Sequence, residues 1–72
     1  MDILDVKIAK NLTFDDIGKT IRFTVRDVAD YTFVGHLTSI KRADSLDEMY
    51  ILGIGWNITV RVYKNQKIEF VV

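Results

Sequence analysis

The chain has 72 residues, no cysteine and no proline, and its ten acidic residues balance ten basic ones. A domain of this size buries only about 60% of the surface of its unfolded chain, so it holds a single core and is marginally stable. Without cysteine it lacks disulfides and the strongest zinc ligands, which leaves self-association as a source of stability. The 49% of hydrophobic residues excludes a disordered chain. We expect one domain over residues 1–72.

The N-terminal residues differ from an export signal. Met1–Asp5 is acidic, whereas a secretory signal begins with basic residues and continues with an apolar stretch of about 7–15 residues. The longest apolar run, Met49–Trp56, spans eight residues, far fewer than the roughly 20 that cross a membrane. We therefore expect a cytoplasmic protein that does not bind membranes.

The first 18 residues fit two structures. Apolar residues at positions 4, 6 and 8 alternate with other residues, which favours a strand, whereas those at positions 4, 8 and 12 suit a short helix. We favour the strand. Thr13–Asp16 resembles a helix start, because the Thr13 hydroxyl is placed to cap the third following amide and two acids follow it. Gly18 is expected to end this turn.

Alternation with a period of two follows Gly18 and predicts strands for most of the remaining chain. Lys19–Arg26 places its apolar residues on one face and its polar residues on the other. The acids in Asp27–Asp30 predict a turn. Tyr31–Ile40 resumes the strand pattern, with a bend or bulge expected at Gly35.

The second half of the chain predicts a loop and three strands, the last two joined by a hairpin turn. Lys41–Glu48 is polar and is expected to be the loop. Met49–Trp56 is continuously apolar, which is typical of a strand covered on both faces, so we place it at the centre of the sheet. Alternation returns from Trp56 to position 63, and Lys64–Lys67 predicts a hairpin turn. The last strand ends in Phe70–Val72 without a polar tail, so we expect it to be the edge that pairs with a second copy.

An open sheet of five or six short strands leaves unpaired backbone N–H and C=O groups along its two edge strands. Closing the sheet pairs these groups. We therefore expect an all-β fold, a small and strongly bent antiparallel barrel with a short helix or turn near the N-terminus. The expected core residues are Ile21, Phe23, Val25, Phe33, Leu37, Ile51, Trp56, Ile58, Val60, Ile68 and Phe70. Truncating Phe23 or Trp56 to alanine is expected to cost about 3–5 kcal/mol.

Three stretches resemble the Sm-like and wider SH3-like small barrels. Gly18–Val25 is similar to the glycine-lysine strand of the Sm-like pattern, Phe33–Leu37 to its strand with a central glycine, and Met49–Leu52 follows after a loop. The resemblance covers residues 18–72 and implies a small bent barrel. Sm-like RNA binders also carry an Asp/Asn-rich loop and an Arg-Gly or Lys-Gly motif before the last strand. Residues 44–48 and 64–67 match neither, so the resemblance implies the fold rather than RNA binding.

The sequence offers few residues for catalysis or metal binding. The one histidine, His36, is expected to point to the opposite strand face from Ser39, which disfavours a triad. The acidic clusters, Asp15–Asp16 and Asp44 with Asp47–Glu48, are typical of solvated or capping turn residues, with weak cation binding as the alternative. One histidine with scattered carboxylates makes a poor metal site. We expect no enzyme activity, no metal and no cofactor.

The remaining feature is a set of basic and aromatic residues on polar strand faces. The candidate binding residues are Arg22, Arg26, Lys41, Arg42, Arg61 and Tyr63. Arginine beside an exposed aromatic residue suits single-stranded nucleic acid, but the zero net charge disfavours it. We expect a non-catalytic binding or assembly module that acts through protein contacts and forms a homo-oligomer. The alternative is a barrel that binds RNA or single-stranded DNA, with salt-sensitive affinity that Arg22→Ala and Arg61→Ala would reduce.

Overall fold

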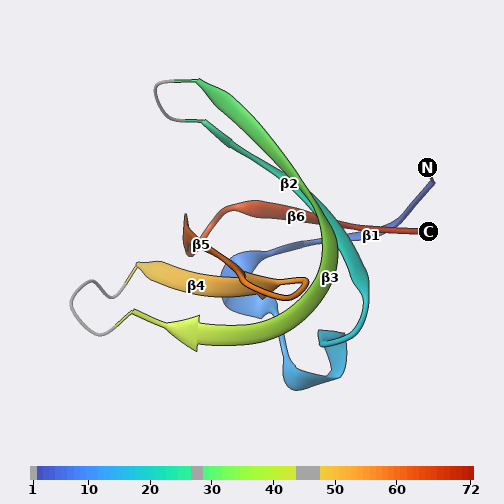
Figure 1. The fold of residues 1–72 in the computed structure, drawn as a ribbon, viewed down its shortest axis with the longest axis horizontal. Helices are drawn as coiled ribbons and strands as arrows, with labels where there is room; N and C mark the ends of the chain where they lie inside the picture. The colour runs from blue at the N-terminus through green and yellow to red at the C-terminus, as the bar shows by residue number, and fades with distance from the viewer. Residues whose placement is uncertain (1, 27–28, 44–47) are drawn as a thin grey trace.

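The computed structural model describes residues 2–26, 29–43 and 48–72, and this part of the chain is all-β (Figure 1). Six antiparallel strands form one sheet, in the order β1-β6-β2-β3-β4-β5. The strands are β1 (Ile3–Ile8), β2 (Thr20–Arg26), β3 (Asp30–Arg42), β4 (Met49–Ile54), β5 (Ile58–Tyr63) and β6 (Lys67–Val71). The predicted all-β, strongly bent antiparallel fold is confirmed. Among the described residues, no helix is long and apolar enough to cross a membrane.

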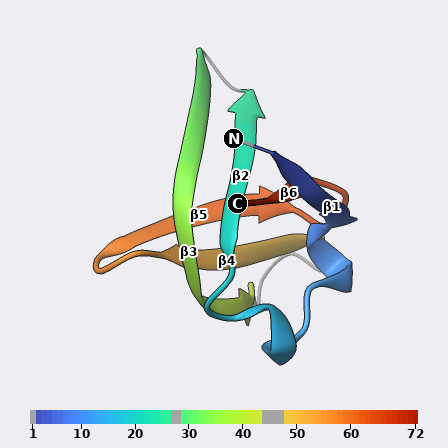
Figure 2. The same cartoon turned by 90° about the vertical axis from the view of Figure 1, so that its right-hand side faces the viewer.

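The longest strand, β3, bends the sheet. Its first half pairs with β2 and its second half with β4, so β2 stands upright in Figure 2 while β4 and β5 run across it. The register with β4 shifts between Leu37 and Ser39, which places a bulge at Thr38. We predicted the bend at Gly35 and a loop from Lys41, whereas β3 continues to Arg42. Residues 44–47 of the predicted loop, and residues 27–28 of the predicted turn before β3, lie outside the described residues.

Gly35 has a packing role instead. A Cβ atom at this position would lie 2.7 Å from Cγ2 of Ile54, which is closer than side chains tolerate. Gly53 is similarly restricted, because a Cβ atom there would overlap the Ser39 hydroxyl group. The two glycines therefore let β3 and β4 cross closely at the bend.

The ends of the sheet differ from our expectation. In the described part of the chain, β1 and β5 are the edge strands and no strand pairing joins them. β6 lies between β1 and β2, so the prediction of an edge at the C-terminus is wrong. β4 lies next to the edge, so the central place predicted for Met49–Trp56 is also wrong. Backbone N–H groups after β1 donate to the turn before β6, from Ala9 to Gln66 O and from Lys10 to Lys64 O, both at 2.9 Å.

The core lies on the inner face of the bent sheet. Its buried residues are Ala9, Ile21, Phe23, Leu37, Leu52, Ile54, Val62, Ile68 and Phe70. Val25, Phe33 and Val60 pack partly against them, as predicted. Ile51, Trp56 and Ile58 were also expected in the core. Ile51 instead lies in a row with the exposed Lys41 and Arg61, Trp56 is 100% exposed and Ile58 is 52% exposed. Because β4 ends at Ile54, Trp56 falls in the turn, and Ile58 is the first residue of β5.

The N-terminal segment is a strand followed by two short 3-10 helices. β1 pairs with β6 from Ile3 to Ile8, which confirms the strand and excludes the helix. The helices are η1 (Ala9–Asn11) and η2 (Phe14–Asp16), and η2 is the turn predicted from Thr13. Gly18 follows η2 with φ +98°, as expected for a residue that ends a helical turn.

Candidate functional site

The β4–β5 hairpin carries an apolar side chain that the fold leaves uncovered. Its turn contains Gly55, which has φ +63° and donates its N–H to His36 O at 2.9 Å. Trp56 follows with its whole surface in water, and half of Ile58 is exposed beside it. No charged residue occurs from position 49 to position 60. Covering this turn would remove apolar surface from water without desolvating a charge.

β5 presents an open backbone edge next to this turn. It pairs only with β4 among the described strands, in an unbroken register from Met49 opposite Tyr63 to Ile54 opposite Ile58. In an antiparallel pair, groups that do not bond across the ladder point outward, where another strand can pair with them. Edges are commonly protected by a bulge, a proline or charges. β5 has neither bulge nor proline, and Arg61 is its only charge.

The structure brings three of the six predicted binding residues to one face. Lys41, Ile51 and Arg61 are paired across β3, β4 and β5, and Tyr63 is paired with Met49 in a nearby row. These residues lie on the outer face, because strand alternation puts them opposite the buried positions of the same strands. Lys41, Arg61 and Tyr63 are exposed, so two cations and an aromatic ring share this surface.

The other three predicted residues lie apart from that face. Arg42 is in the row of Tyr50 and Val62, which contribute to the core side of the sheet. Arg22 and Arg26 are on β2, opposite the first half of β3, whereas Lys41 is near its far end. Nε of Arg22 donates to Oε1 of Glu69 at 2.9 Å, so this charge is already paired. The six residues therefore do not form one continuous basic surface.

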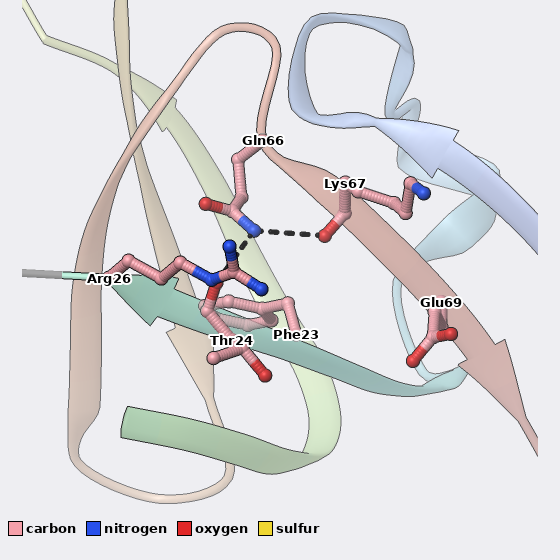
Figure 3. Close-up of a pocket in the computed structure, with 6 residues that line it drawn as sticks. All are labelled: Phe23, Thr24, Arg26, Gln66, Lys67 and Glu69. Carbon is pink, nitrogen blue, oxygen red and sulfur yellow. Dashed lines mark hydrogen bonds between the residues drawn. The ribbon is translucent and has the colours of Figure 1, made fainter. Parts of the chain in front are cut away.

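Arg26 borders a hollow of about 280 Å³ between β2 and β6 (Figure 3). The other lining residues are Phe23, Thr24, Gln66, Lys67 and Glu69. Nε2 of Gln66 donates to the carbonyl oxygens of Thr24 and Lys67, at 3.0 and 3.1 Å, and so ties β2 to the start of β6. Figure 3 shows the Lys67 side chain extending away from Arg26. The two cations do not converge on one ligand position.

A second hollow, of about 300 Å³, lies between the η1–η2 segment and β3. Its walls are Leu12, Phe14 and Ile40, with Thr13 as the one polar residue. Leu12 and Ile40 also pack against the core, whereas Phe14 is 83% exposed. The hollow is therefore apolar, with two walls that pack against the core and a third, the Phe14 ring, that is exposed to solvent.

His36, Asp15 and Glu48 are surface groups. His36 is exposed on β3, and its Nδ1 lies 3.2 Å from the Thr20 hydroxyl. Among the residues that the structure describes, no group of three histidine or carboxylate side chains is placed to hold a metal ion. Asp15 and Glu48 are exposed, while Asp44 and Asp47 lie outside the described residues.

Asp16 is a buried charge that the sequence did not reveal. Only 1% of it is exposed, and its carboxylate accepts the Thr13 backbone N–H at 3.0 Å. The Nζ atoms of Lys7 and Lys19 each lie 3.2 Å from its oxygens. The same two ammonium groups lie 5.6 and 5.5 Å from the centroid of the Phe70 ring. This group, which we call the Asp16 cluster, joins η2 to β1 and β6.

Burial by itself would raise the pKa of the Asp16 carboxyl group. The Thr13 N–H and the Lys19 and Lys7 ammonium groups outweigh this effect, so the pKa of Asp16 is lowered from its ordinary value. The Lys7 and Lys19 ammonium groups both stabilise the ionised Asp16 carboxylate. In the described structure no buried side-chain polar atom lacks a hydrogen-bond partner. The cluster is a fully satisfied structural ion group. The signal for it was Thr13-x-x-Asp16, a capping pattern.

Comparison with known proteins returns no protein family, no curated protein and no solved structure that matches this chain.

Proposed function

We propose that the protein is a non-catalytic binding or assembly module that contacts other proteins, including copies of itself, through the β4–β5 hairpin. The fully exposed Trp56, beside Ile58 at the start of an open strand edge, carries this proposal. Tryptophan is enriched among the residues that dominate binding energy, because it buries a large area with few rotatable bonds. A small domain gains stability when such a residue is covered.

The β5 edge supplies a second means of contact. An extended segment of a partner adds beside β5 through backbone hydrogen bonds, and its side chains then alternate between the two faces of the sheet. The row of Lys41, Ile51 and Arg61 continues into such a strand. A carboxylate beside Arg61 is favoured there and a cation is disfavoured, because directly opposed charges interact across a strand pair. The outer face thus selects for acidic or neutral strands.

Sedimentation velocity over a wide concentration range tests the proposal. We expect the native protein to associate as its concentration rises and Trp56→Ala to shift this association to higher concentration. Tyr31→Ser is the matched control, because Tyr31 is an exposed aromatic residue on β3, outside the hairpin. A native protein that stays monomeric throughout, or equal association of the Trp56 variant, contradicts self-association through the hairpin.

Single-stranded nucleic acid is the second candidate ligand, because Lys41, Arg61 and Tyr63 share the outer face. Cations and an exposed aromatic ring on one surface can follow a phosphate backbone and stack a base. Binding of labelled mixed-sequence RNA and DNA at about 50 and 200 mM salt tests this, since phosphate-driven affinity falls with salt. Arg61→Ala is then expected to weaken binding more than Arg22→Ala, because Arg22 is already paired with Glu69. Absence of binding at both salt concentrations removes this candidate.

A further inference from the structure

The chain carries an uncovered indole and an apolar hollow in different places. Trp56 is 100% exposed, so it does not fill the hollow of its own chain. The hollow lined by Leu12, Thr13, Phe14 and Ile40 lies on the inner side of β3, where Ile40 pairs with Leu52. Trp56 lies in the turn past Ile54, where β4 ends, and its full exposure shows that it contacts no wall of the hollow in its own chain. An indole that occupies the hollow is therefore supplied by a second molecule.

The size of the hollow fits one indole. A cavity of about 150 Å³ is enough to hold benzene, and the hollow here measures about 300 Å³. The bicyclic ring of tryptophan is larger than benzene and smaller than a drug-sized ligand, for which pockets begin near 300 Å³. The hollow therefore has room for an indole side chain.

The chemistry of the hollow also fits an indole. Leu12, Phe14 and Ile40 provide an apolar lining, and the exposed Phe14 ring is available for an aromatic contact. The indole has one polar atom, the Nε1 donor, which needs an acceptor when it is covered. The Thr13 hydroxyl is the one side-chain acceptor in the lining. It donates to Oδ2 of Asp16 at 3.5 Å and takes part in the capping box with the Asp16 backbone N–H, which leaves one lone pair for the indole.

We infer that the partner of the hairpin is a second copy of this chain, and that its Trp56 indole occupies the hollow lined by Leu12, Thr13, Phe14 and Ile40. This inference rests on the proposed function and assigns the surface that receives Trp56. One aromatic anchor implies weak association that depends on concentration. Because donor and acceptor surfaces differ, each can be removed separately.

Trp56 is the only tryptophan in the chain, so its fluorescence reports this contact directly. As concentration rises, the emission of the native protein is expected to shift to shorter wavelength and quenching by acrylamide to fall. Phe14→Ser removes an exposed wall of the hollow and is expected to weaken association about 30-fold, as truncation of a hot-spot residue does. Tyr31→Ser, which removes an exposed aromatic residue outside both surfaces, should leave association unchanged.

A mixing experiment isolates the assigned contact. The Trp56→Ala variant has an intact hollow and no tryptophan, whereas the Phe14→Ser variant has a damaged hollow and keeps Trp56. Titrating the first into the second is expected to shift the emission of the second to shorter wavelength until it saturates. The control is a double variant that carries both Trp56→Ala and Phe14→Ser. Titrating this double variant into the Phe14→Ser variant should cause no shift, because its hollow is damaged.

The outcomes separate the inference from the proposed function. A saturating shift in the mixture, together with weak self-association of each variant, supports the inference. Association that Trp56→Ala weakens and Phe14→Ser does not would place the indole on another surface, which overturns the inference and leaves the proposed function intact. A native protein with neither association nor a concentration-dependent emission shift overturns the inference. It also overturns the part of the proposed function that concerns contacts between copies of this chain.

Discussion

β1 and β5 are the two edges of the same sheet, and they are protected very differently. The register of β1 with β6 shifts between Ile3 and Asp5, and the Asp5 carboxylate accepts the Val6 N–H at 2.8 Å. A bulge and an internally bonded amide both hinder the addition of a strand. β5 has a regular register along its whole length and begins two residues after the exposed Trp56.

The two edges also differ in how they are held. Lys7 of β1 reaches Asp16, and with Lys19 it lies over the Phe70 ring of β6, so the Asp16 cluster fastens the N-terminal edge. No comparable ion cluster is described for β5, whose strand residues in the described structure bond to β4 alone. An edge that is bulged and held by an internal ion cluster is a poor template for strand addition. Under the proposed function, β5 is therefore the edge that partners use.

The largest expected effect contrasts Phe70 of β6, next to the β1 edge, with Trp56, in the turn before the β5 edge. Phe70→Ala removes a buried ring that two ammonium groups face, and it should destabilise the protein by about 3–5 kcal/mol. Trp56→Ala should change stability by no more than about 0.5 kcal/mol, because its side chain is fully exposed. Urea unfolding measures both. A large loss of stability for Trp56→Ala in the monomer would mean that the turn packs against the core.

A smaller loss of stability is expected when the Asp16 charge, which pairs with Lys7 of β1, is removed. Asp16→Asn keeps the shape but loses the charged hydrogen bonds, and should cost about 2 kcal/mol at neutral pH. The pKa of Asp16 is lowered in the folded protein, so its stabilisation is present above its unfolded pKa and is lost as pH falls below about 4. The native protein and the variant should therefore converge in acid.

The control for this experiment is Asp15→Asn, because Asp15 is exposed next to Asp16 in η2. It should follow the native protein at every pH. A constant difference between the native protein and Asp16→Asn from neutral pH into acid would show that the carboxylate charge does not fasten this edge.

Alternation located the strands wherever one face of a strand is polar. β2, with Ile21 and Phe23 inward, and β6, with Ile68 and Phe70 inward, follow the predicted faces. Alternation is absent from Met49–Trp56, because every position there is apolar, so the sequence indicates neither the inward-facing residues nor the end of the strand. The structure buries Leu52 and Ile54 and releases Trp56 into the turn.

The candidate site was only partly predictable for a related reason. Lys41 and Arg61 were recognised as polar-face residues, but their common row depends on the pairing of three strands. The ion pair of Arg22 with Glu69 joins residues 47 positions apart, and the Asp16 cluster needs β1 to lie beside β6. Local patterns identify residue faces, whereas contacts between distant strands decide which charges are paired and which edge is open.

The last prediction compares the two edges directly through one type of substitution. Ile58 of β5 and Leu4 of β1 are exposed apolar residues, at 52% and 69%, so Ile58→Lys and Leu4→Lys should each change monomer stability little. A lysine on an open edge opposes strand addition, because its charge would have to be desolvated. Ile58→Lys should therefore weaken self-association several-fold in sedimentation velocity, and Leu4→Lys should not. If the two variants weaken association equally, then the bulge and the Asp5 carboxylate do not close the β1 edge, and both ends of the sheet take part in assembly.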